Sequence, residues 1–196
     1  MMNENKNERR DLPTTAQFEQ ELKRLRRKDI FRRSLLSTVS SLIVVAAIAV
    51  LISTMLLPIL RVTGTSMIPT LRHDEVLLCN KAATLQRGDV IAFYYNNKVL
   101  LKRVIGTTGD VIDITEDGTV YLNGEALDEP YVNELARGEC DIELPYQVPD
   151  NRIFVMGDHR AVSIDSRSAA VGCVADENII GKVSAVIFPL KSARLL

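Results

Sequence analysis

The 196-residue sequence has few of the residues that bind metal ions or form covalent cross-links. Its three cysteines, Cys79, Cys140 and Cys173, include no C-x-x-C pair, and its only histidines are His73 and His159. This pattern excludes a disulfide framework and a zinc site, and we expect no bound metal. One disulfide with one free thiol and three buried thiols both remain open.

Charge is scarce in one long stretch and unevenly divided elsewhere. Residues 1–33 carry ten Lys/Arg and six Asp/Glu, residues 34–60 carry no charge, and residues 61–196 carry fourteen Lys/Arg and nineteen Asp/Glu. The last segment is therefore acidic, which argues against nucleic-acid binding. No internal repeat is evident, and the length allows one compact domain plus an anchor.

The uncharged stretch, residues 34–60, predicts a transmembrane helix. Twenty-seven helical residues would span roughly 40 Å, against a hydrocarbon core of about 30 Å. Pro58 is expected to mark its outer end. The cluster of Lys/Arg before it predicts a cytoplasmic N-terminus. We therefore expect a cytoplasmic tail over 1–33 with a basic juxtamembrane helix, a single transmembrane helix over 34–60 and an extracytoplasmic domain over 61–196.

Other interpretations of the N-terminal part are weaker. Residues 47–49, Ala-Ile-Ala, have the form of a signal-peptide cleavage site, but the apolar run continues to Leu60, whereas a cleavable signal would turn polar there. A buried core helix is disfavoured by the length. Residues 1–17 are polar and predicted to be disordered. From Gln17 a helical pattern begins, and its basic residues are expected to contact anionic lipid headgroups.

The remainder predicts a mostly β domain, a coiled antiparallel β-sheet with few helices. Apolar runs bounded by turn residues predict strands over 75–79, 89–95, 98–105, 110–114, 120–122, 125–127, 153–156 and 183–188. Asn96-Asn97 and Asn123-Gly124 indicate hairpins. Residues 128–150, rich in acids and prolines, are predicted to leave the core as an excursion.

Three stretches carry candidate chemistry, and the first is Gly64–Leu71. Its turn-rich composition predicts a loop that displays Ser66. A serine in such a loop can act as a nucleophile. The alternative is a hydroxyl that only caps or tightens the turn.

The second stretch is the strand that contains Lys102. Alternation places Lys102 on one face with Leu100 and Val104, and Arg103 on the other. If the first face is buried, desolvation lowers the pKa of the lysine, and a neutral amine can take a proton from a serine hydroxyl. The alternative is a lysine that extends to solvent at a sheet edge. Arg103 is expected to be a structural ion-pair residue.

The third stretch, Gly157–Arg167, follows an apolar strand and is rich in acids, arginines and serines. If these side chains are buried, they must be paired, and they would then hold the base in place. The alternative is a polar surface loop. Gly157 is expected to form a tight turn. His159, oriented by Asp158 or Asp165, is a second candidate base, ranked below Lys102 because it lies on no apolar strand face.

Together these stretches resemble bacterial type I signal peptidase, a membrane-bound serine protease family. The resemblance runs from the apolar stretch to about residue 189. It rests on ordered blocks at 64–71, 87–90, 102–106 with 109–110, and 157–167 with 181–182. It implies a β-rich catalytic domain with an apolar surface near the active site that contacts the membrane.

The resemblance also implies roles for individual residues. Ser66 would be the acyl-forming nucleophile, with its backbone N–H donating to the oxyanion, and Lys102 the general base. Ser163 would hydrogen-bond the lysine amine. Asp165 and Arg167 would pair to brace the site, and Arg103 and Asp158 would support it.

The sequence departs from the family pattern at several positions. Gly64 replaces a serine whose hydroxyl completes the oxyanion hole in some members, although other members also carry glycine there. His159 stands where asparagine is usual. Residues 168–172 differ from the block that the family pattern predicts after Arg167. The segment between Leu127 and Arg152 is short beside that of the larger family members. Lys102 separates the chain from relatives in the endoplasmic reticulum, which have a histidine as base.

The resemblance therefore implies a single-pass enzyme of the plasma membrane that removes signal peptides from exported preproteins. Cleavage would follow small-x-small (Ala-x-Ala) sites through an acyl-enzyme, without a cofactor. Its partners would be preproteins and the lipid bilayer, with the secretion translocon as a further candidate. The alternatives are a peptidase specialised for a narrow substrate such as a pilin, and a non-catalytic homologue that acts in assembly.

Overall fold

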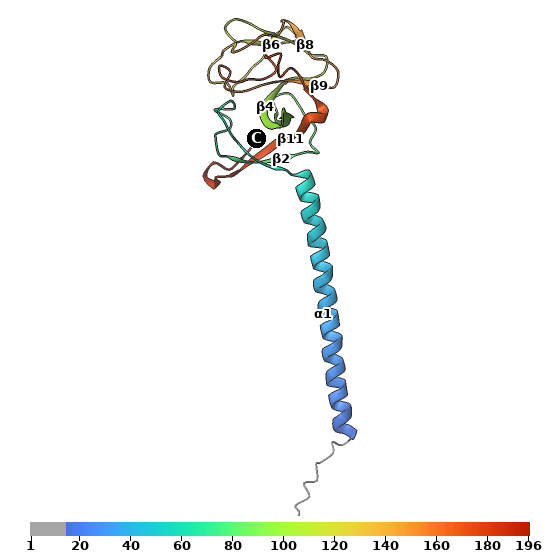
Figure 1. The fold of residues 1–196 in the computed structure, drawn as a ribbon. Helices are drawn as coiled ribbons and strands as arrows, with labels where there is room; N and C mark the ends of the chain where they lie inside the picture. Colours follow the sequence, from blue (N-terminus) through green and yellow to red (C-terminus); the bar gives the residue numbers. More distant parts are fainter. Residues whose placement is uncertain (1–14) are drawn as a thin grey trace, which may run out of the picture. The chain divides into compact units, whose positions relative to one another are not determined.

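The structure is a computed structural model that describes residues 15–196. The described chain forms two units, residues 15–52 and residues 53–196. Helix α1 (Thr15–Leu56) begins in the first unit and ends in the second, and the rest of the second unit is built from short and medium strands (Figure 1). The prediction of disorder over residues 1–17 lies mostly outside the described residues, but Thr15, Ala16 and Gln17 are helical.

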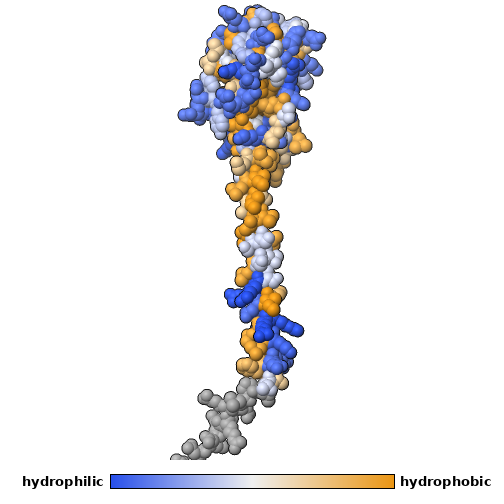
Figure 2. Space-filling view, turned by 90° about the vertical axis from the view of Figure 1, so that its right-hand side faces the viewer, coloured by the Kyte–Doolittle hydropathy of each residue, from blue (hydrophilic) through white to orange (hydrophobic). Residues whose placement is uncertain are grey.

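Helix α1 has 42 residues, about 63 Å at the rise of an α-helix. It is the one described helix long and apolar enough to cross a membrane, by length and composition. Basic side chains gather on its N-terminal part and apolar side chains on the rest (Figure 2). The helix ends four residues before the predicted boundary at Leu60. Pro58 disfavours the helical conformation at Leu57 and has no N–H to continue the hydrogen-bond ladder.

The chain then enters the larger of two antiparallel sheets. Strand β1 (Ile59–Arg61) pairs with β2 (Val76–Asn80), and the sheet order is β1-β2-β11-β3-β4-β9-β10, with β12 added to β11. The remaining strands are β3 (Val90–Tyr95), β4 (Lys98–Gly106), β9 (Arg152–Met156), β10 (Val174–Ala175), β11 (Ile179–Phe188) and β12 (Arg194–Leu195). The mostly β, antiparallel fold predicted from the sequence is confirmed.

The second sheet has four short strands in the order β7-β6-β5-β8. These are β5 (Val111–Ile114), β6 (Val120–Leu122), β7 (Glu125–Ala126) and β8 (Tyr146–Gln147). Two single turns of 3-10 helix, η1 (Asp176–Asn178) and η2 (Leu190–Ser192), flank β11.

Both predicted hairpins form, and their backbone angles explain the residues used. Asn96 and Asn97 join β3 to β4 with φ of 44° and 59°, and Asn123 and Gly124 join β6 to β7 with φ of 56° and 87°. Two successive positive φ values are typical of the turn that matches the twist of a two-residue hairpin. Asparagine and glycine tolerate that conformation best.

The prediction that residues 128–150 leave the core is wrong. β8 pairs with β5, and Ile142, Leu144 and Tyr146 pack against the cluster that contains Phe154. The acids and prolines of this segment suggested an exposed loop, but its apolar residues alternate with polar ones and bury one face. Like β1, β10 and β12, β8 is too short to produce a recognisable pattern in the sequence.

The register of the larger sheet brings the three candidate stretches together. In β4, Lys102 lies opposite Ile91 of β3, and Arg103 lies between Val90 of β3 and Met156 of β9. Met156 is the last residue of β9, so the chain that follows it runs beside Lys102 and Arg103. The sequence alone does not give this pairing, because β4 and β9 are separated by 45 residues.

Candidate active site

The site is built around one contact between side chains 36 residues apart. The Nζ atom of Lys102 lies 2.8 Å from the Oγ atom of Ser66. Ser66 is half-buried, while Lys102 is 3% exposed. A serine hydroxyl and a lysine amine at this distance can exchange a proton directly.

Buried neighbours hold the loop that carries Ser66. Val62, Met67 and Leu71 belong to one core cluster and are at most 3% exposed. The Leu71 N–H donates to the Met67 carbonyl at 2.8 Å, which closes the turn after the serine. The Ser66 carbonyl accepts from the N–H of His159 at 3.0 Å. The serine is thus fixed on both sides, while its hydroxyl stays accessible.

Lys102 lies on the buried face predicted for it, with Leu100 and Val104 in a core cluster. Burial lowers the pKa of Lys102 to about 8 because the ammonium loses its hydration. The nearby carboxylates of Asp165 and Asp158 partly oppose this shift, while the Arg167 guanidinium adds to it. Burial is the largest effect, so a substantial fraction of the lysine is neutral in mildly alkaline solution.

Arg103, the neighbour of Lys102, links three segments. Its guanidinium contacts both carboxylate oxygens of Asp158, at 2.6 and 2.8 Å. It also donates to the Gly88 carbonyl at 2.7 Å and to the Thr70 hydroxyl at 3.0 Å, four residues after Ser66. The structural ion pair predicted for Arg103 is present, and it ties the strand of the lysine to the loop of the serine.

Asp165 and Arg167 form a second, fully buried pair. Arg167 Nε and one terminal nitrogen contact the two Asp165 oxygens at 2.8 and 2.9 Å. Asp165 also accepts from the N–H of Gly157 at 2.9 Å, which fixes the start of the loop. The charged side chains of this stretch, among them Asp158, Asp165 and Arg167, are therefore buried and paired, and the surface-loop alternative is excluded for them.

Gly64 and two polar side chains of this loop complete the set of predicted residues. Gly64 has a φ of +95°, and its N–H donates to His73 Nδ1 at 3.1 Å. The hydrogen bonds of residues 15–196 do not include the predicted one between Ser163 and Lys102; Ser163 Oγ is buried without a partner. The Nδ1 atom of His159 is also unpartnered, and the contact of His159 with Ser66 is through its backbone.

The reason for glycine at position 157 differs from the tight turn expected. Gly157 is not among the residues with positive φ. A Cβ there would lie 2.2 Å from Ser163 Oγ and 2.6 Å from the Ser66 carbonyl oxygen. Glycine is required because two oxygens approach the same backbone position. Sequence reasoning could not find this, since the close approach depends on the tertiary fold.

Sequence reasoning also missed a strap formed by residues 129–141 across the buried loop. Glu129 accepts two hydrogen bonds from the buried Arg160, whose Nε donates to the Gly157 carbonyl. The ring of Tyr131 lies 3.8 Å from the Arg103 guanidinium carbon. The Arg137 carbonyl accepts from Arg167 at 2.6 Å. The strap thus contacts three of the arginines that surround the site.

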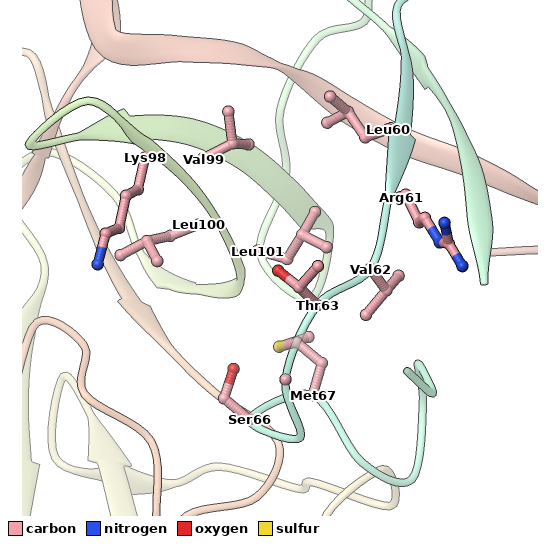
Figure 3. Close-up of a pocket in the computed structure, with 11 residues that line it drawn as sticks. Leu60, Arg61, Val62, Thr63, Ser66, Met67, Lys98, Val99, Leu100 and Leu101 are labelled. Carbon is pink, nitrogen blue, oxygen red and sulfur yellow. The ribbon is translucent and has the colours of Figure 1, made fainter. Parts of the chain in front are cut away.

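A groove of about 450 Å³ opens beside Ser66. One wall is residues 60–64 with Met67, and the other is Lys98–Leu101 of β4, while Ser66 lies at one end of this group (Figure 3). Leu60, Val62, Met67 and Leu101 make much of the lining apolar. Over this part of β4, strand β3 pairs on one side, and the pairing with β9 begins only at Arg103.

No group of three or more metal-ligating side chains occurs in the part of the chain that the structure describes. Cys79, Cys140 and Cys173 are all free thiols, the first and last of them buried. The cysteines therefore form no disulfide. This excludes the arrangement of one disulfide with one free thiol, which the sequence had left open. Burial raises the pKa of Cys79 to about 11, so this thiol is unreactive near neutral pH.

Comparison with known proteins agrees with this site. The family model for signal peptidase, peptidase S26, matches residues 35–188. These residues include both side chains of the 2.8 Å contact and the buried loop around them. The chain is therefore a peptidase. It belongs to the S26 signal peptidase family.

The sequences of two relatives support the same family. The chain is 34% identical over 167 residues to signal peptidase I of Bacillus amyloliquefaciens, covering 79% of this chain and 86% of that protein. It is 33% identical over 178 residues to signal peptidase IB of Staphylococcus aureus strain Mu50, covering 81% and 92%. A crystal structure of a signal peptidase I from Enterococcus faecalis V583 matches 51% of this chain and 97% of that one, with 29% identity and a TM-score of 0.42.

The close approach at Gly157 predicts a large effect from one methyl group. We expect Gly157→Ala to lower kcat for peptide cleavage by about 100-fold, because Ser66 or Ser163 must move and ångström-scale misplacement has that cost. Gly172→Ala is the control for a backbone effect: its φ of +59° strains an alanine, but its Cβ would meet only one atom, at 4.0 Å, so the residues around Ser66 need not move. Kinetics at a temperature where circular dichroism shows both variants folded measure the effect. Equal activity in the two variants would contradict this packing.

Proposed function

We propose that this protein is a membrane-anchored serine endopeptidase that removes signal peptides from exported preproteins. Ser66 is the nucleophile and Lys102 the general base. The observation that carries the proposal is the 2.8 Å contact between a half-buried serine and a desolvated lysine at the edge of an apolar groove. Family membership supports the substrate class, because the similar relatives are signal peptidases.

The first chemical step transfers a proton and forms a bond. The Ser66 hydroxyl donates its proton to the neutral Lys102 amine while its oxygen attacks the carbonyl carbon of the scissile peptide. Negative charge then develops on the carbonyl oxygen. The Ser66 N–H has no acceptor among the hydrogen bonds of residues 15–196, so it is free to donate to that oxygen. Gly64 has no hydroxyl to offer, and any second donor is a backbone group.

The second half of the reaction reverses these roles. The Lys102 ammonium gives its proton to the leaving amine, and the peptide bond breaks to leave an ester on Ser66. Lys102, again neutral, takes a proton from a water molecule whose oxygen attacks the ester carbon. The bond to Ser66 then breaks, the Lys102 ammonium returns the proton to the Ser66 oxygen, and the acid product leaves. One base serves both steps, and neither requires a cofactor.

The supporting residues exclude water from Lys102 and hold it in position. We propose that the ion pairs Arg103–Asp158 and Asp165–Arg167 brace the strand and the loop on either side of Lys102. Ser163, whose buried hydroxyl is unpartnered, is proposed to orient the lysine amine once substrate closes the site. Catalytic hydrogen bonds are commonly longer or absent before substrate binds.

The groove suits an extended peptide. Main-chain groups of β4 that β3 does not use are available to pair with a substrate strand. In an extended chain, the first and third residues before the cut point to the same side, and the second points away. Apolar residues such as Leu60 and Leu101 line the groove, and we propose that they receive the small side chains on that side. This supports a preference for small-x-small sites such as Ala-x-Ala.

Helix α1 supports the proposed location. An apolar section of sufficient length follows a basic section within one helix, an order typical of a membrane anchor with its N-terminal end in the cytoplasm. We propose a single pass through the plasma membrane with the catalytic domain on the outer side. The bilayer, preproteins and the secretion translocon are the proposed partners.

Cleavage of a preprotein tests the dyad and the specificity together. The full-length protein in detergent is expected to cut a preprotein after the second alanine of an Ala-x-Ala site. Ser66→Ala is expected to abolish cleavage. Lys102→Met is expected to reduce it by about 10²- to 10⁴-fold, which is the contribution of a positioned base. Gel mobility and N-terminal sequencing of the product give the rate and the cut position.

Each other result of the cleavage experiment would contradict a different part of the proposal. Cleavage retained in Lys102→Met would rule out the lysine as base, and His159 would be tested next. No cleavage by the wild type of a general preprotein, with cleavage of a pilin precursor, would show a narrow substrate range. No cleavage of either would favour a non-catalytic role, which the intact serine–lysine pair argues against.

The pH dependence follows from the buried amine. Only neutral Lys102 can act as base, so activity is low below its pKa and rises as the proton is lost. We expect kcat/KM to rise with an apparent pKa of about 8, falling tenfold per pH unit below it. The measurement is the pH profile of peptide cleavage. A profile that is flat between pH 7 and 9 would contradict a desolvated lysine base.

A further inference from the structure

One hydrogen bond joins the groove to a histidine that the proposed mechanism does not use. The N–H of Gly64 donates to the Nδ1 atom of His73 at 3.1 Å. On the other side of the ring, His73 Nε2 lies 3.3 Å from Asp74 Oδ1, and the same oxygen lies 3.1 Å from the Arg61 guanidinium. The imidazole therefore connects the groove wall to a surface ion pair.

This arrangement requires a neutral imidazole with its proton on Nε2. A neutral ring has one acceptor nitrogen and one donor nitrogen. Because Nδ1 accepts from Gly64, Nε2 must carry the hydrogen, on the side of the ring where Asp74 Oδ1 lies. A second proton would have to sit on Nδ1, where it would face the Gly64 N–H. Protonation of His73 therefore breaks this hydrogen bond.

The hydrogen bond to His73 is important for the position of Gly64, because this residue has few other contacts. Gly64 lines the groove two residues before Ser66, has no side chain to pack and has nothing within 4 Å of where a Cβ would be. Its φ of +95° is a conformation that is available to glycine but not preferred. Among the hydrogen bonds of the described residues, the Gly64 N–H makes one, which is the bond to His73.

The turn that presents His73 is itself fixed. Asp74 has a φ of +69°, unusual for a residue with a side chain. Its N–H donates to the Val62 carbonyl at 3.0 Å, and the Val62 N–H donates to the Glu75 carbonyl at 2.8 Å. The backbone that carries the exposed imidazole of His73 is thus held beside the segment that leads to the serine.

We propose that His73 is a positioning residue for the reaction: its Nδ1 atom fixes the Gly64 peptide in the groove wall, and cleavage weakens when the ring is protonated. The inference rests on the proposed peptidase function. Histidine is the side chain that ordinarily changes charge between about pH 5 and 8. The sequence has only one other histidine, His159.

Several charged groups face this ring. Asp74, which also pairs with Arg61, contacts the ring at Nε2. His73 also shares a cavity with Arg72, Glu75, Lys191 and Arg194, of which Glu75 and Arg194 are paired with each other. The ring is therefore surrounded by both signs of charge, and the test compares variants at each pH.

The test compares kcat/KM of three full-length proteins in detergent from pH 5.5 to 8.5, on one peptide with an Ala-x-Ala site. His73→Asn places an amide oxygen where Nδ1 was, an acceptor that does not titrate. His73→Ala removes the acceptor at every pH. The titration of Lys102 is common to all three proteins and cancels in the ratios between them.

Loss of one exposed hydrogen bond predicts a change of about 2- to 10-fold. The wild type should match His73→Asn at pH 8.5 and fall to the level of His73→Ala at pH 5.5. The kcat/KM of His73→Ala divided by that of His73→Asn should stay low and constant across the pH range. The same fall relative to the Asn variant should persist in a His159→Asn background, which excludes the other histidine.

Two kinetic results would overturn the inference: a ratio of wild type to His73→Asn that does not change with pH, or His73→Ala equal to the wild type throughout. If no protein cleaves the peptide, the peptidase proposal fails and a second measurement decides the histidine contact. The amide proton of Gly64, followed by NMR, should shift with pH in the wild type and not in His73→Asn. A shift in neither protein would contradict the contact.

Discussion

The structure depends on keeping one amine out of water without giving it a carboxylate partner. Lys102 is 3% exposed, yet two aspartates lie close enough to influence its pKa. Each of those aspartates is already paired, Asp158 with Arg103 and Asp165 with Arg167. An unpaired carboxylate in the same place would hold the lysine in its charged form. The two arginines therefore leave burial as the dominant effect on Lys102 and leave Ser66 as its hydrogen-bond partner.

The cost of burying these charges explains the rest of the site. Arg160 and Arg167 are at most 1% exposed, and a buried guanidinium needs an acceptor for nearly all of its donors. Carbonyl groups of the strap and of the loop provide them, together with Glu129. The close backbone approach at Gly157 is a consequence of packing this network against the serine loop. The contact between Ser66 and Lys102 is thus set by segments far apart in the sequence.

Local sequence patterns predicted much of the fold and of the site. The features that they missed depend on contacts between residues far apart in the sequence. Alternation in β4 placed Lys102 on a buried face, and paired asparagines predicted a hairpin, because both signals lie within a few residues. The helix end at Leu56 was missed because hydropathy does not distinguish an apolar strand such as β1 from the helix before it. The strap, the closeness at Gly157 and the bond between Gly64 and His73 depend on tertiary contacts, which no short stretch encodes. The predicted bond from Ser163 to Lys102 came from resemblance alone, and the structure leaves that hydroxyl unpartnered.

The most direct test of this account is the ionisation of Lys102 itself, measured by NMR titration of the full-length protein labelled with ¹³C at the ε carbon of lysine. The Lys102→Met variant assigns the signal. The account predicts one lysine that titrates with a pKa of about 8, well separated from exposed lysines near 10.4. If the signal lost in the variant titrates together with the exposed lysines, the amine is charged at neutral pH and the serine has no base.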